Sequence, residues 1–385
     1  MTYQLALNWD DFLAPYGQQK HVVLRQALAP FVDPLTADEL AGMAMEEQID
    51  SRLVSRCHGQ WQVAHGPFTS FDELGETDWS LLVQAVDHWH PQAAELMEPF
   101  RQLPNWRLDD LMISFSVPGG GVGPHIDQYD VFIIQGMGRR RWRVGDRGQH
   151  PQHCPTPGLL QVPEFEPLID VELEAGDILY IPPGFPHDGY ALTPALNYSV
   201  GFRAPNQREL FSQLADQLLA QDGGNRRYAD PDLTPRSASG CVTSEDVQRL
   251  RELMSSLLDD EAFACQLVQS LSEAKHELDL EPVDPPYAEG EILDLVLQDD
   301  AVLRLGGLRA FYLQQTPGTC FIHGEQFAVP AGAEALMRQL CDHTRLATGA
   351  LRTALEEPAA LAWFTMLINA GYWYFASDWQ AEEAE

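Results

Sequence analysis

Short apolar segments separated by glycine and proline dominate the chain from Leu111 to about Pro205. The segments are Leu111–Val117, Val131–Gln135, Arg139–Val144, Ile178–Ile181 and Asn197–Phe202. Many short strands with turn residues between them are typical of an antiparallel sandwich or barrel. Upstream, Trp9–Leu13 is expected to be helical and His21–Leu24 to form a strand. Thr36 with Glu39 three residues later predicts a capped helix. Residues 1–205 therefore form a first block.

Helical periodicity replaces the strand pattern in a second block, residues 206–276. Within Gln207–Ala220 the apolar residues recur every three or four positions, which indicates an amphipathic helix. A polar loop and two further helical stretches, Ser244–Leu258 and Glu261–Leu271, follow. These helices are too few for a deep core of their own. We therefore expect them to bury their apolar stripes against a second copy of the chain, or against the first block.

A proline-rich acidic linker, Glu281–Pro286, opens the third block, residues 277–385. Short strands are expected in Arg309–Gln314 and Cys320–Val329, and helices near Glu334–Leu340 and Pro358–Ala370. This size and pattern fit a winged-helix-like module. Arginines are sparse in this block among many acidic residues, which disfavours DNA binding.

The composition suits a folded protein of the cytoplasm. The chain has 385 residues, of which 45% are hydrophobic, enough for a sizeable core. No apolar run is long enough to span a bilayer, and the N-terminus lacks the basic and apolar regions of a signal peptide. Six cysteines are scattered singly, which indicates reduced thiols and neither disulfides nor a zinc site.

A net charge of -33 argues against a nucleic-acid partner, because the phosphate backbone would be repelled. The same charge would steer a basic protein toward the chain. The acidity could equally serve solubility alone.

The chemistry is concentrated at Pro124–Asp127. Side chains two residues apart on a strand face the same side, so His125 and Asp127 should project together. An imidazole beside a carboxylate supplies two ligands of the 2-His-1-carboxylate triad that binds Fe(II) with open positions for co-substrate and oxygen. The other interpretation is surface histidines and an aspartate in a turn.

A third ligand is expected from His187. The apolar strand Ile178–Ile181 leads into the turn Pro182-Pro183-Gly184, and His187 begins the next strand. An antiparallel strand can return to the edge of the barrel that carries His125. Neither motif is specific alone, but the two in this order within a β-rich block form a strong signal.

A cation for the distal carboxylate of 2-oxoglutarate is offered by Gly138–Val144. Alternation places Arg140, Trp142 and Val144 on the buried face and the other arginines on the opposite face. A buried arginine needs an anion, and its planar fork suits a carboxylate. Arg140 is therefore assigned to the co-substrate, unless an internal acid neutralises it.

Polar strand residues could complete the pocket. Ser114 and Ser116 share a face of the strand before Pro124, and Asn197 and Ser199 share a face of the strand after His187. Ser114 and Asn197 are the candidates for hydrogen bonds to the co-substrate. Strand side chains of this kind that face solvent are the simpler alternative.

These residues resemble the JmjC-domain, cupin-like oxygenases, and most closely the bacterial ribosomal oxygenases. The matching stretches are Pro124–Asp130, Gly138–Trp142, Pro182–His187 and Tyr198–Pro205. The order of the three blocks matches as well, so the resemblance spans nearly the whole chain. It implies an α+β fold: a double-stranded β-helix barrel (the cupin/JmjC fold), a helical dimerisation region and a winged-helix-like C-terminal domain.

The resemblance also implies an activity. His125, Asp127 and His187 would bind Fe(II), and Arg140, with help from Ser114, would hold 2-oxoglutarate where many relatives use lysine. The reaction would couple oxidative decarboxylation of 2-oxoglutarate by O2 to hydroxylation of an arginine in the sixteenth large-subunit ribosomal protein. A homodimer is expected, and no motif identifies the pocket for the target arginine.

Two other functions remain open. Another protein hydroxylase or a lysine demethylase of the JmjC class would use the same triad on a different residue. A non-catalytic cupin-like scaffold would bind a basic partner through its acidic surface, although the complete triad with Arg140 argues against it.

Overall fold

The computed structural model of the chain describes residues 3–220, 222–259 and 261–378. They form two compact units. The first comprises the chain up to Ala204 together with Lys275–Glu281 and Leu305–Leu308, and the second comprises the remainder. Within the described ranges, no helix has the length and apolar character needed to cross a membrane.

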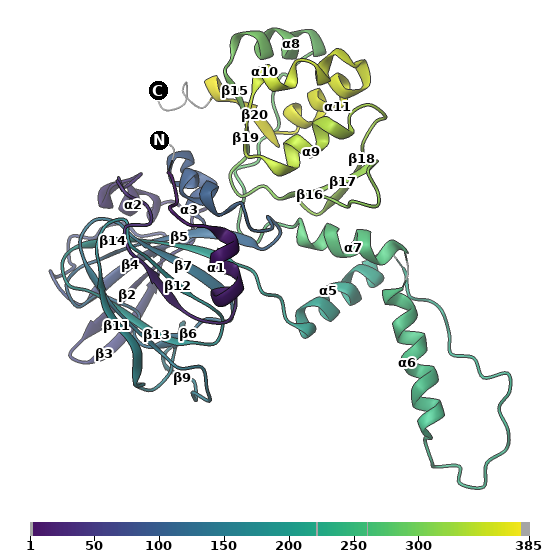
Figure 1. Cartoon of the computed structure of the whole chain (residues 1–385), viewed down its shortest axis with the longest axis horizontal. Helices are drawn as coiled ribbons and strands as arrows, with labels where there is room; N and C mark the ends of the chain where they lie inside the picture. The colour runs from purple at the N-terminus through teal and green to yellow at the C-terminus, as the bar shows by residue number, and fades with distance from the viewer. Residues whose placement is uncertain (1–2, 221, 260, 379–385) are drawn as a thin grey trace. The chain divides into compact units, whose positions relative to one another are not determined.

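Two antiparallel sheets form the first unit (Figure 1). The larger has eight strands in the order β1-β12-β7-β14-β5-β4-β2-β3, and the smaller has four in the order β11-β8-β13-β6. The bounds are β1 Val22–Leu24, β2 Ser51–Cys57, β3 Gln60–His65, β4 Trp79–Val83, β5 Leu108–Ser116, β6 His125–Ile126, β7 Asp130–Gln135, β8 Arg140–Gly145, β11 Pro167–Leu173, β12 Ile178–Ile181, β13 Pro186–Ala191 and β14 Ala195–Phe202. A separate hairpin joins β9 (His153–Thr156) and β10 (Leu159–Gln161). The predicted β-barrel is confirmed.

Short helices cover one face of the larger sheet. They are α1 Trp9–Tyr16, α2 Ala37–Met43, α3 Val86–Trp89, α4 Pro91–Ala94 and the 3-10 helix η1 Glu95–Phe100. Thr36 caps α2 as predicted, because its hydroxyl accepts from the Glu39 N–H while the Glu39 carboxylate accepts from the Thr36 N–H. Phe12 and Phe100 from the helices pack on Phe132 of β7, with ring centroids 5.6 and 5.0 Å apart.

Strand alternation separates two cores. Phe132 and Ile134 of β7 belong to the core beneath the helices. Val131 and Ile133 pack instead with side chains of the smaller sheet, among them Trp142. The second core therefore lies between the two sheets, on the interior side of the barrel.

A β-bulge interrupts the pairing of β5 with β14. Leu108 pairs with Phe202 and Leu111 with Val200, so Asp109 and Asp110 together oppose the single residue Gly201. Leu108 and Leu111 both belong to the core beneath the helices. Neither aspartate does, and both lie within 4 Å of the place where a Gly201 side chain would begin. The bulge thus directs two successive carboxylates away from that core.

Three helices open the second unit: α5 Gln207–Ala220, α6 Ser244–Leu258 and α7 Glu261–Leu271. The side chain of Gln217 on α5 donates to the carbonyl of Gln266 on α7 at 2.7 Å. Helix α6 buries none of its residues fully. An apolar stripe of four side chains is exposed along it: Val247, Leu250, Met254 and Leu258.

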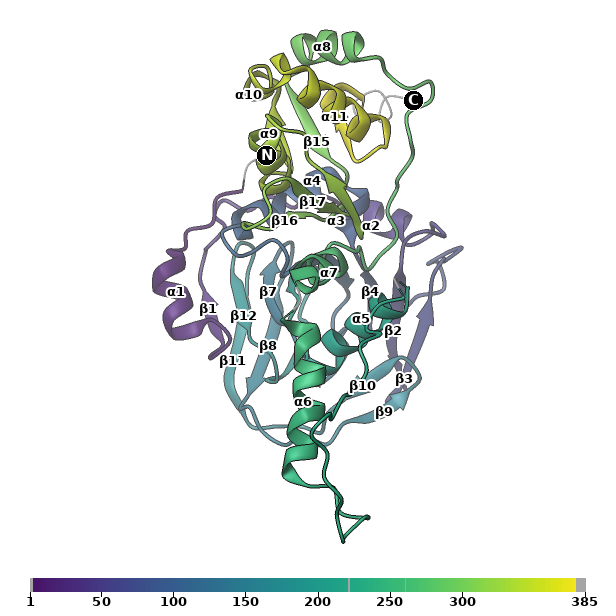
Figure 2. The ribbon, with the colours of Figure 1, turned by 90° about the vertical axis from the view of Figure 1, so that its right-hand side faces the viewer.

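The rest of the second unit combines helices with two three-stranded sheets. The helical elements are α8 Glu289–Gln298, α9 Glu334–Asp342, α10 Thr348–Leu351, the 3-10 helix η2 Ala354–Glu356 and α11 Pro358–Asn369. The sheets are β19-β15-β20 (Arg345–Ala347, Ala301–Arg304, Trp373–Phe375) and β16-β17-β18 (Ala310–Tyr312, Thr319–Ile322, Glu325–Ala328). Figure 2 shows the helices gathered around β15. The predicted winged-helix-like module is confirmed.

Candidate functional site

The two candidate histidines lie on neighbouring strands. His125 begins β6 and His187 is the second residue of β13, and the two residues are direct partners in the antiparallel ladder. The turn before β13 contributes as well, because the N–H of Gly184 donates to the Asp127 carbonyl at 2.8 Å. Gly184 has a φ of 84°, which favours glycine. His187 therefore pairs with the strand that carries His125, as the sequence predicted.

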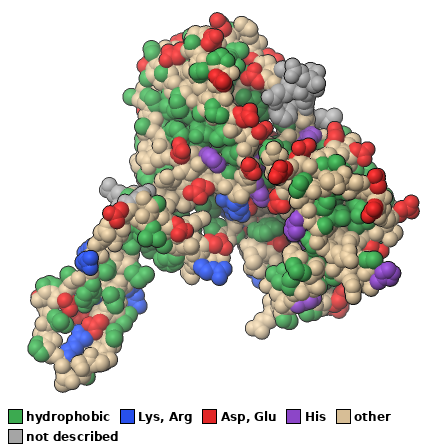
Figure 3. All heavy atoms as spheres, turned by 180° about the vertical axis from the view of Figure 1, so that it is seen from behind, with side chains coloured by type: hydrophobic (Ala, Val, Ile, Leu, Met, Phe, Trp, Pro, Cys, Tyr) green, Lys and Arg blue, Asp and Glu red, His purple; other side chains and the backbone are tan. Residues whose placement is uncertain are grey.

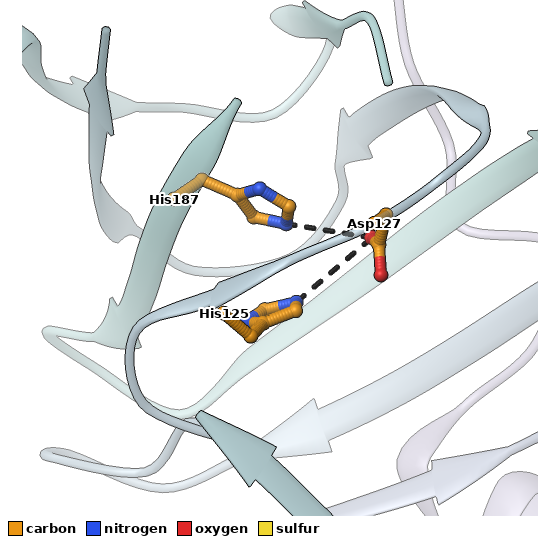
Figure 4. Close-up of side chains that lie close together, drawn as sticks. All are labelled: His125, Asp127 and His187. Atoms are coloured by element: carbon orange, nitrogen blue, oxygen red, sulfur yellow. Dashed lines mark ion pairs between the residues drawn. The ribbon is translucent and has the colours of Figure 1, made fainter. Parts of the chain in front are cut away.

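Asp127 follows β6 and turns its carboxylate toward both imidazoles, whose ring centroids are 4.2 Å apart (Figure 4). Its Oδ2 lies 3.9 Å from Nε2 of His125 and 3.5 Å from Nε2 of His187. One ligand atom from each of the three residues lies within 4.8 Å of the others. This is a compact cluster that a single metal ion could bridge.

Backbone carbonyls orient both rings. Nδ1 of His125 lies 2.8 Å from the carbonyl of Gly123, and Nδ1 of His187 lies 3.0 Å from that of Phe185. A ring whose proton lies on Nδ1 leaves the lone pair of Nε2 free for a metal ion. Such carbonyl contacts orient histidine ligands in metal centres.

The protonation states of His125 and Asp127 favour metal binding. Burial lowers the pKa of His187, but its hydrogen bond to Asp127 and the charge of that carboxylate outweigh that effect and raise the pKa. Burial lowers the pKa of His125 to about 4, and the neighbouring His187 adds to that shift. Burial raises the pKa of Asp127, but the His187 hydrogen bond and the two imidazoles outweigh it and lower the value to about 2. At neutral pH the site therefore holds a carboxylate beside a neutral imidazole, the forms that bind a divalent metal.

Arg140 begins β8 and points into the barrel, as alternation predicts, with 5% of its surface exposed. Its Nη1 donates to Ser116 at 2.9 Å and to Ser114 at 3.5 Å, and its Nη2 donates to the Gly189 carbonyl at 3.0 Å. Its Nε is buried and has no partner in the structure.

No ion pair joins Arg140 to a carboxylate among the residues that the structure describes. The nearby Asp188 is paired with Arg143 at 2.6 Å. Burial lowers the pKa of Arg140 to about 10, so the group remains charged at neutral pH. An internal acid is therefore not what neutralises it, and a buried guanidinium in this state fits a carboxylate ligand.

Asn197 lies in the same row of the larger sheet as Ser114, its direct partner in the ladder. Its Oδ1 is buried without a hydrogen-bond partner. The structure thus brings Arg140, Ser114 and Asn197 together as expected. It adds Ser116, which lies nearer to Arg140 than Ser114 does.

Three residues near the site were not predicted from the sequence. The hydroxyl of Tyr129 lowers the pKa of Asp127, while burial, followed by the charges of Asp127 and Asp110, raises the pKa of Tyr129 itself. Asp109 and Asp110 are placed by the bulge in β5. Only Tyr129 could have been inferred from the sequence, because it lies two residues after Asp127. The bulge has no recognisable sequence pattern in this polar stretch.

The residues fit a 2-His-1-carboxylate iron centre with a 2-oxoglutarate site beside it. Two imidazoles and one carboxylate supply three ligand atoms, and a 2-His-1-carboxylate iron centre keeps its other positions for co-substrate and oxygen. Arg140 supplies an unneutralised cation on the same interior face. The histidines, Asp127 and Arg140 thus provide the groups that metal and co-substrate require.

Comparisons with known proteins agree with this site. Residues 95–210 match the JmjC domain family, and residues 252–374 match the ROXA-like winged helix family. The Ribosomal protein uL16 3-hydroxylase of Escherichia coli is 54% identical, over 97% of this chain and 100% of that protein. A Haemophilus influenzae protein named "Probable ribosomal oxygenase" is 30% identical, over 82% of this chain and 80% of its own.

Solved structures show the same likeness in three dimensions. The E. coli ribosomal oxygenase YcfD in complex with cobalt and 2-oxoglutarate superposes with a TM-score of 0.88 and 52% identity. The match covers 97% of this chain and 99% of that one. The fold, the two matched domains and the full-length relatives together show that this chain belongs to the JmjC-domain ribosomal oxygenase family.

Proposed function

We propose that this chain is an Fe(II)- and 2-oxoglutarate-dependent oxygenase that hydroxylates an arginine side chain of ribosomal protein uL16. The observation that carries the proposal is Arg140, a buried cation without an acidic partner among the described residues, in the same barrel as His125, Asp127 and His187. The name of the E. coli relative supports uL16 as the substrate, and the cobalt and 2-oxoglutarate complex of YcfD supports the co-substrate.

Each residue has a defined part in this reaction. His125, Asp127 and His187 would hold the ion, and the backbone hydrogen bonds of the two histidines would keep both Nε2 atoms directed at it. Arg140 takes the distal carboxylate of 2-oxoglutarate through its fork, while Ser114 and Ser116 position the guanidinium. Bound iron and 2-oxoglutarate would activate O2, the oxidant for an unactivated carbon, with 2-oxoglutarate oxidised to succinate and CO2.

Asn197 and Tyr129 complete the surroundings of the metal and co-substrate. The side-chain amide of Asn197 beside Ser114 has an N–H group that could donate to the co-substrate, whose carboxylates and ketone only accept. The Tyr129 hydroxyl holds the carboxylate of Asp127. A tyrosine in that place fixes the orientation of a ligand whose position would otherwise depend on a loop.

The target guanidinium is received by Asp110. Alternation places Asp110 on the face of β5 that carries Met112 and Ser114, and its charge reaches Tyr129. Burial and the neighbouring Asp87 and Asp109 raise its pKa to about 7. Nε2 of His276 lies 3.8 Å away, but burial and the neighbouring His88 lower the pKa of that imidazole, so a cationic side chain would stabilise the ionised carboxylate.

The surface suits a basic protein substrate. The chain has a net charge of -33, and Figure 3 shows acidic side chains scattered over the face in view, with few basic ones. Nucleic acid is therefore not a direct partner. An activity on a ribosomal protein would place the chain in the cytoplasm.

A homodimer formed through the helical region completes the proposal. The exposed apolar stripe of α6 would be buried if it packed on a second copy of the chain. Figure 3 shows hydrophobic side chains at the surface of the part of the molecule that holds α6. The proposed enzyme has three blocks: an oxygenase domain (residues 1–205), a helical dimerisation region (206–276) and a winged-helix-like domain (277–385).

The test is direct. The purified chain with Fe(II) and 2-oxoglutarate is given a uL16 peptide with its arginine, and succinate and peptide mass are measured. Succinate formation coupled to one added oxygen on the arginine is expected, and the matched citrulline peptide should be a poor substrate because it lacks the charge. Hydroxylation or demethylation of a lysine peptide alone would overturn the assignment, and failure to bind iron would favour a scaffold.

A further inference from the structure

The two carboxylates of the bulge have different partners. Asp109 accepts from Nε of Arg203 at 2.6 Å and from Nζ of Lys275 at 2.5 Å, so two cations neutralise it. Asp110 accepts the backbone N–H of Ala85 at 3.1 Å and has no cation within hydrogen-bond distance among the described residues. The pair therefore presents one satisfied carboxylate and one available carboxylate.

Lys275 reaches Asp109 from a distant part of the chain. It follows helix α7 and opens the short segment Lys275–Glu281, which belongs to the first unit. The segment is fixed there, because Nδ1 of the buried His88 lies 3.0 Å from the carbonyl of Glu277. Because the backbone at Lys275 is fixed, the ion pair between Lys275 and Asp109 costs less conformational entropy than one between two mobile elements would.

Lysine is rare in this protein. Lys20 and Lys275 are the only two lysines in the chain, whereas Lys and Arg together number 24. Lys20 is exposed. The side chain of Lys275 is 53% exposed, and its charge acts on both Asp109 and Asp110.

We propose that Lys275 is a positioning residue for the substrate arginine: with Arg203 it occupies Asp109, so that Asp110 alone is left to bind the guanidinium. This inference rests on the proposed function. Without Lys275, Asp109 would keep only its ion pair with Arg203, and more of its negative charge would act on Asp110. The two carboxylates would then repel each other and compete for one guanidinium, which would bind in more than one position.

The first test is kinetic. Lys275→Met should raise KM for the uL16 peptide about fivefold, the upper range for a half-exposed ion pair, while kcat and KM for 2-oxoglutarate stay within twofold. Lys275→Arg should restore KM, since it keeps the charge. Lys20→Met is the matched control and should behave as wild type.

The result that would overturn the proposal is an unchanged peptide KM in Lys275→Met, or a fall in kcat with no change in peptide KM. Equal effects from Lys20→Met would overturn it as well. Absence of peptide hydroxylation by the wild-type chain would instead contradict the proposed function, so the two failures are distinguishable.

A second measurement needs no variant. Reductive methylation with 13C-formaldehyde keeps the positive charge and labels the two lysines and the N-terminal amine. The Lys275 methyl resonance, identified by its loss in Lys275→Arg, should shift when the arginine peptide is added and stay in place with the citrulline peptide. A resonance that is unmoved by a saturating arginine peptide would contradict the role of Lys275 even if Lys275→Met fails to fold.

Discussion

At the scale of single residues, Arg140 shows how the fold prepares a binding group. Three of its contacts go to neutral oxygens of Ser114, Ser116 and Gly189, which orient the guanidinium without neutralising it. Keeping such a charge buried costs free energy that an anionic ligand can recover. The residue is thus held for a ligand and contributes little to stability alone.

Replacing this cation should separate co-substrate binding from metal binding. Arg140→Gln is expected to raise KM for 2-oxoglutarate at least tenfold, because a charge-assisted fork contributes about 1.5–3 kcal/mol. Iron affinity, measured by titration without 2-oxoglutarate, should stay unchanged. Arg139→Gln is the control, since Arg139 is exposed and pairs with Glu172 at 3.4 Å. An unchanged KM in Arg140→Gln would contradict the assignment.

The pH dependence of substrate binding should follow Asp110. Its pKa is raised to about 7, mainly by burial and by Asp87 and Asp109, so the free enzyme holds it protonated at lower pH. A guanidinium binds the ionised form. KM for the uL16 peptide should therefore fall as pH rises from 6 to 8 and level off above the pKa.

Asp110→Asn supplies the control for that profile. The variant should bind the peptide more weakly at pH 8 and lose the change of KM between pH 6 and 8. Because protonation of the metal ligands would also change activity with pH, KM for 2-oxoglutarate is measured in parallel. A profile that keeps its wild-type shape in Asp110→Asn would assign the dependence to another group.

At the scale of strands, alternation accounts for the part of the site that was predictable. It placed His125 beside Asp127, and Arg140 on the buried face of its strand, from sequence alone. Residues that depend on an irregularity were not accessible. Asp109 joins Asp110 opposite Gly201 because of a bulge, and a bulge depends on how two strands pair and not on local residue preferences.

Long-range placement explains the other omission. Lys275 lies far along the chain from Asp109, in a segment that local patterns mark as the end of a helical region. Only the assembled first unit brings the two together. By contrast, the return of His187 to His125 was predictable, because the Pro-Pro-Gly sequence predicts a turn that reverses the chain direction between two strands.

Two strand glycines give a matched test of packing around Arg140. A side chain at Gly189 in β13 would begin 2.6 Å from the Trp142 ring, whereas at Gly201 in β14 its nearest neighbour would be 3.5 Å away. Gly189→Ala should displace Trp142 and the carbonyl that Arg140 bonds. We expect a loss of about 1–3 kcal/mol in the free energy of unfolding, together with a raised KM for 2-oxoglutarate.

Gly201→Ala should change stability by less than about 1 kcal/mol, because its contacts are of ordinary length. Both values can be measured by urea denaturation of the metal-free chain. Equal losses in the two variants would show that a β-strand glycine is costly to replace here for reasons other than Trp142.

At the scale of the whole molecule, the exposed stripe of α6 predicts a concentration-dependent dimer. Met254→Glu places a charge in the middle of the stripe, where Met254 is 64% exposed. The wild type should be dimeric by light scattering at micromolar concentration and the variant monomeric. Gln248→Glu adds the same charge outside the stripe and should leave the mass unchanged. A monomeric wild type would remove the proposed dimer.

The pairing of His125 with His187 across β6 and β13 has a consequence for folding. These ligands are far apart in the chain and meet only when the barrel has closed, so the unfolded chain offers no comparable site. Metal that binds the native state alone stabilises it, by about 2.7 kcal/mol at a free concentration of 100 Kd. Iron supply would then set how many copies of the protein stay folded and escape proteolysis, as well as how many are active.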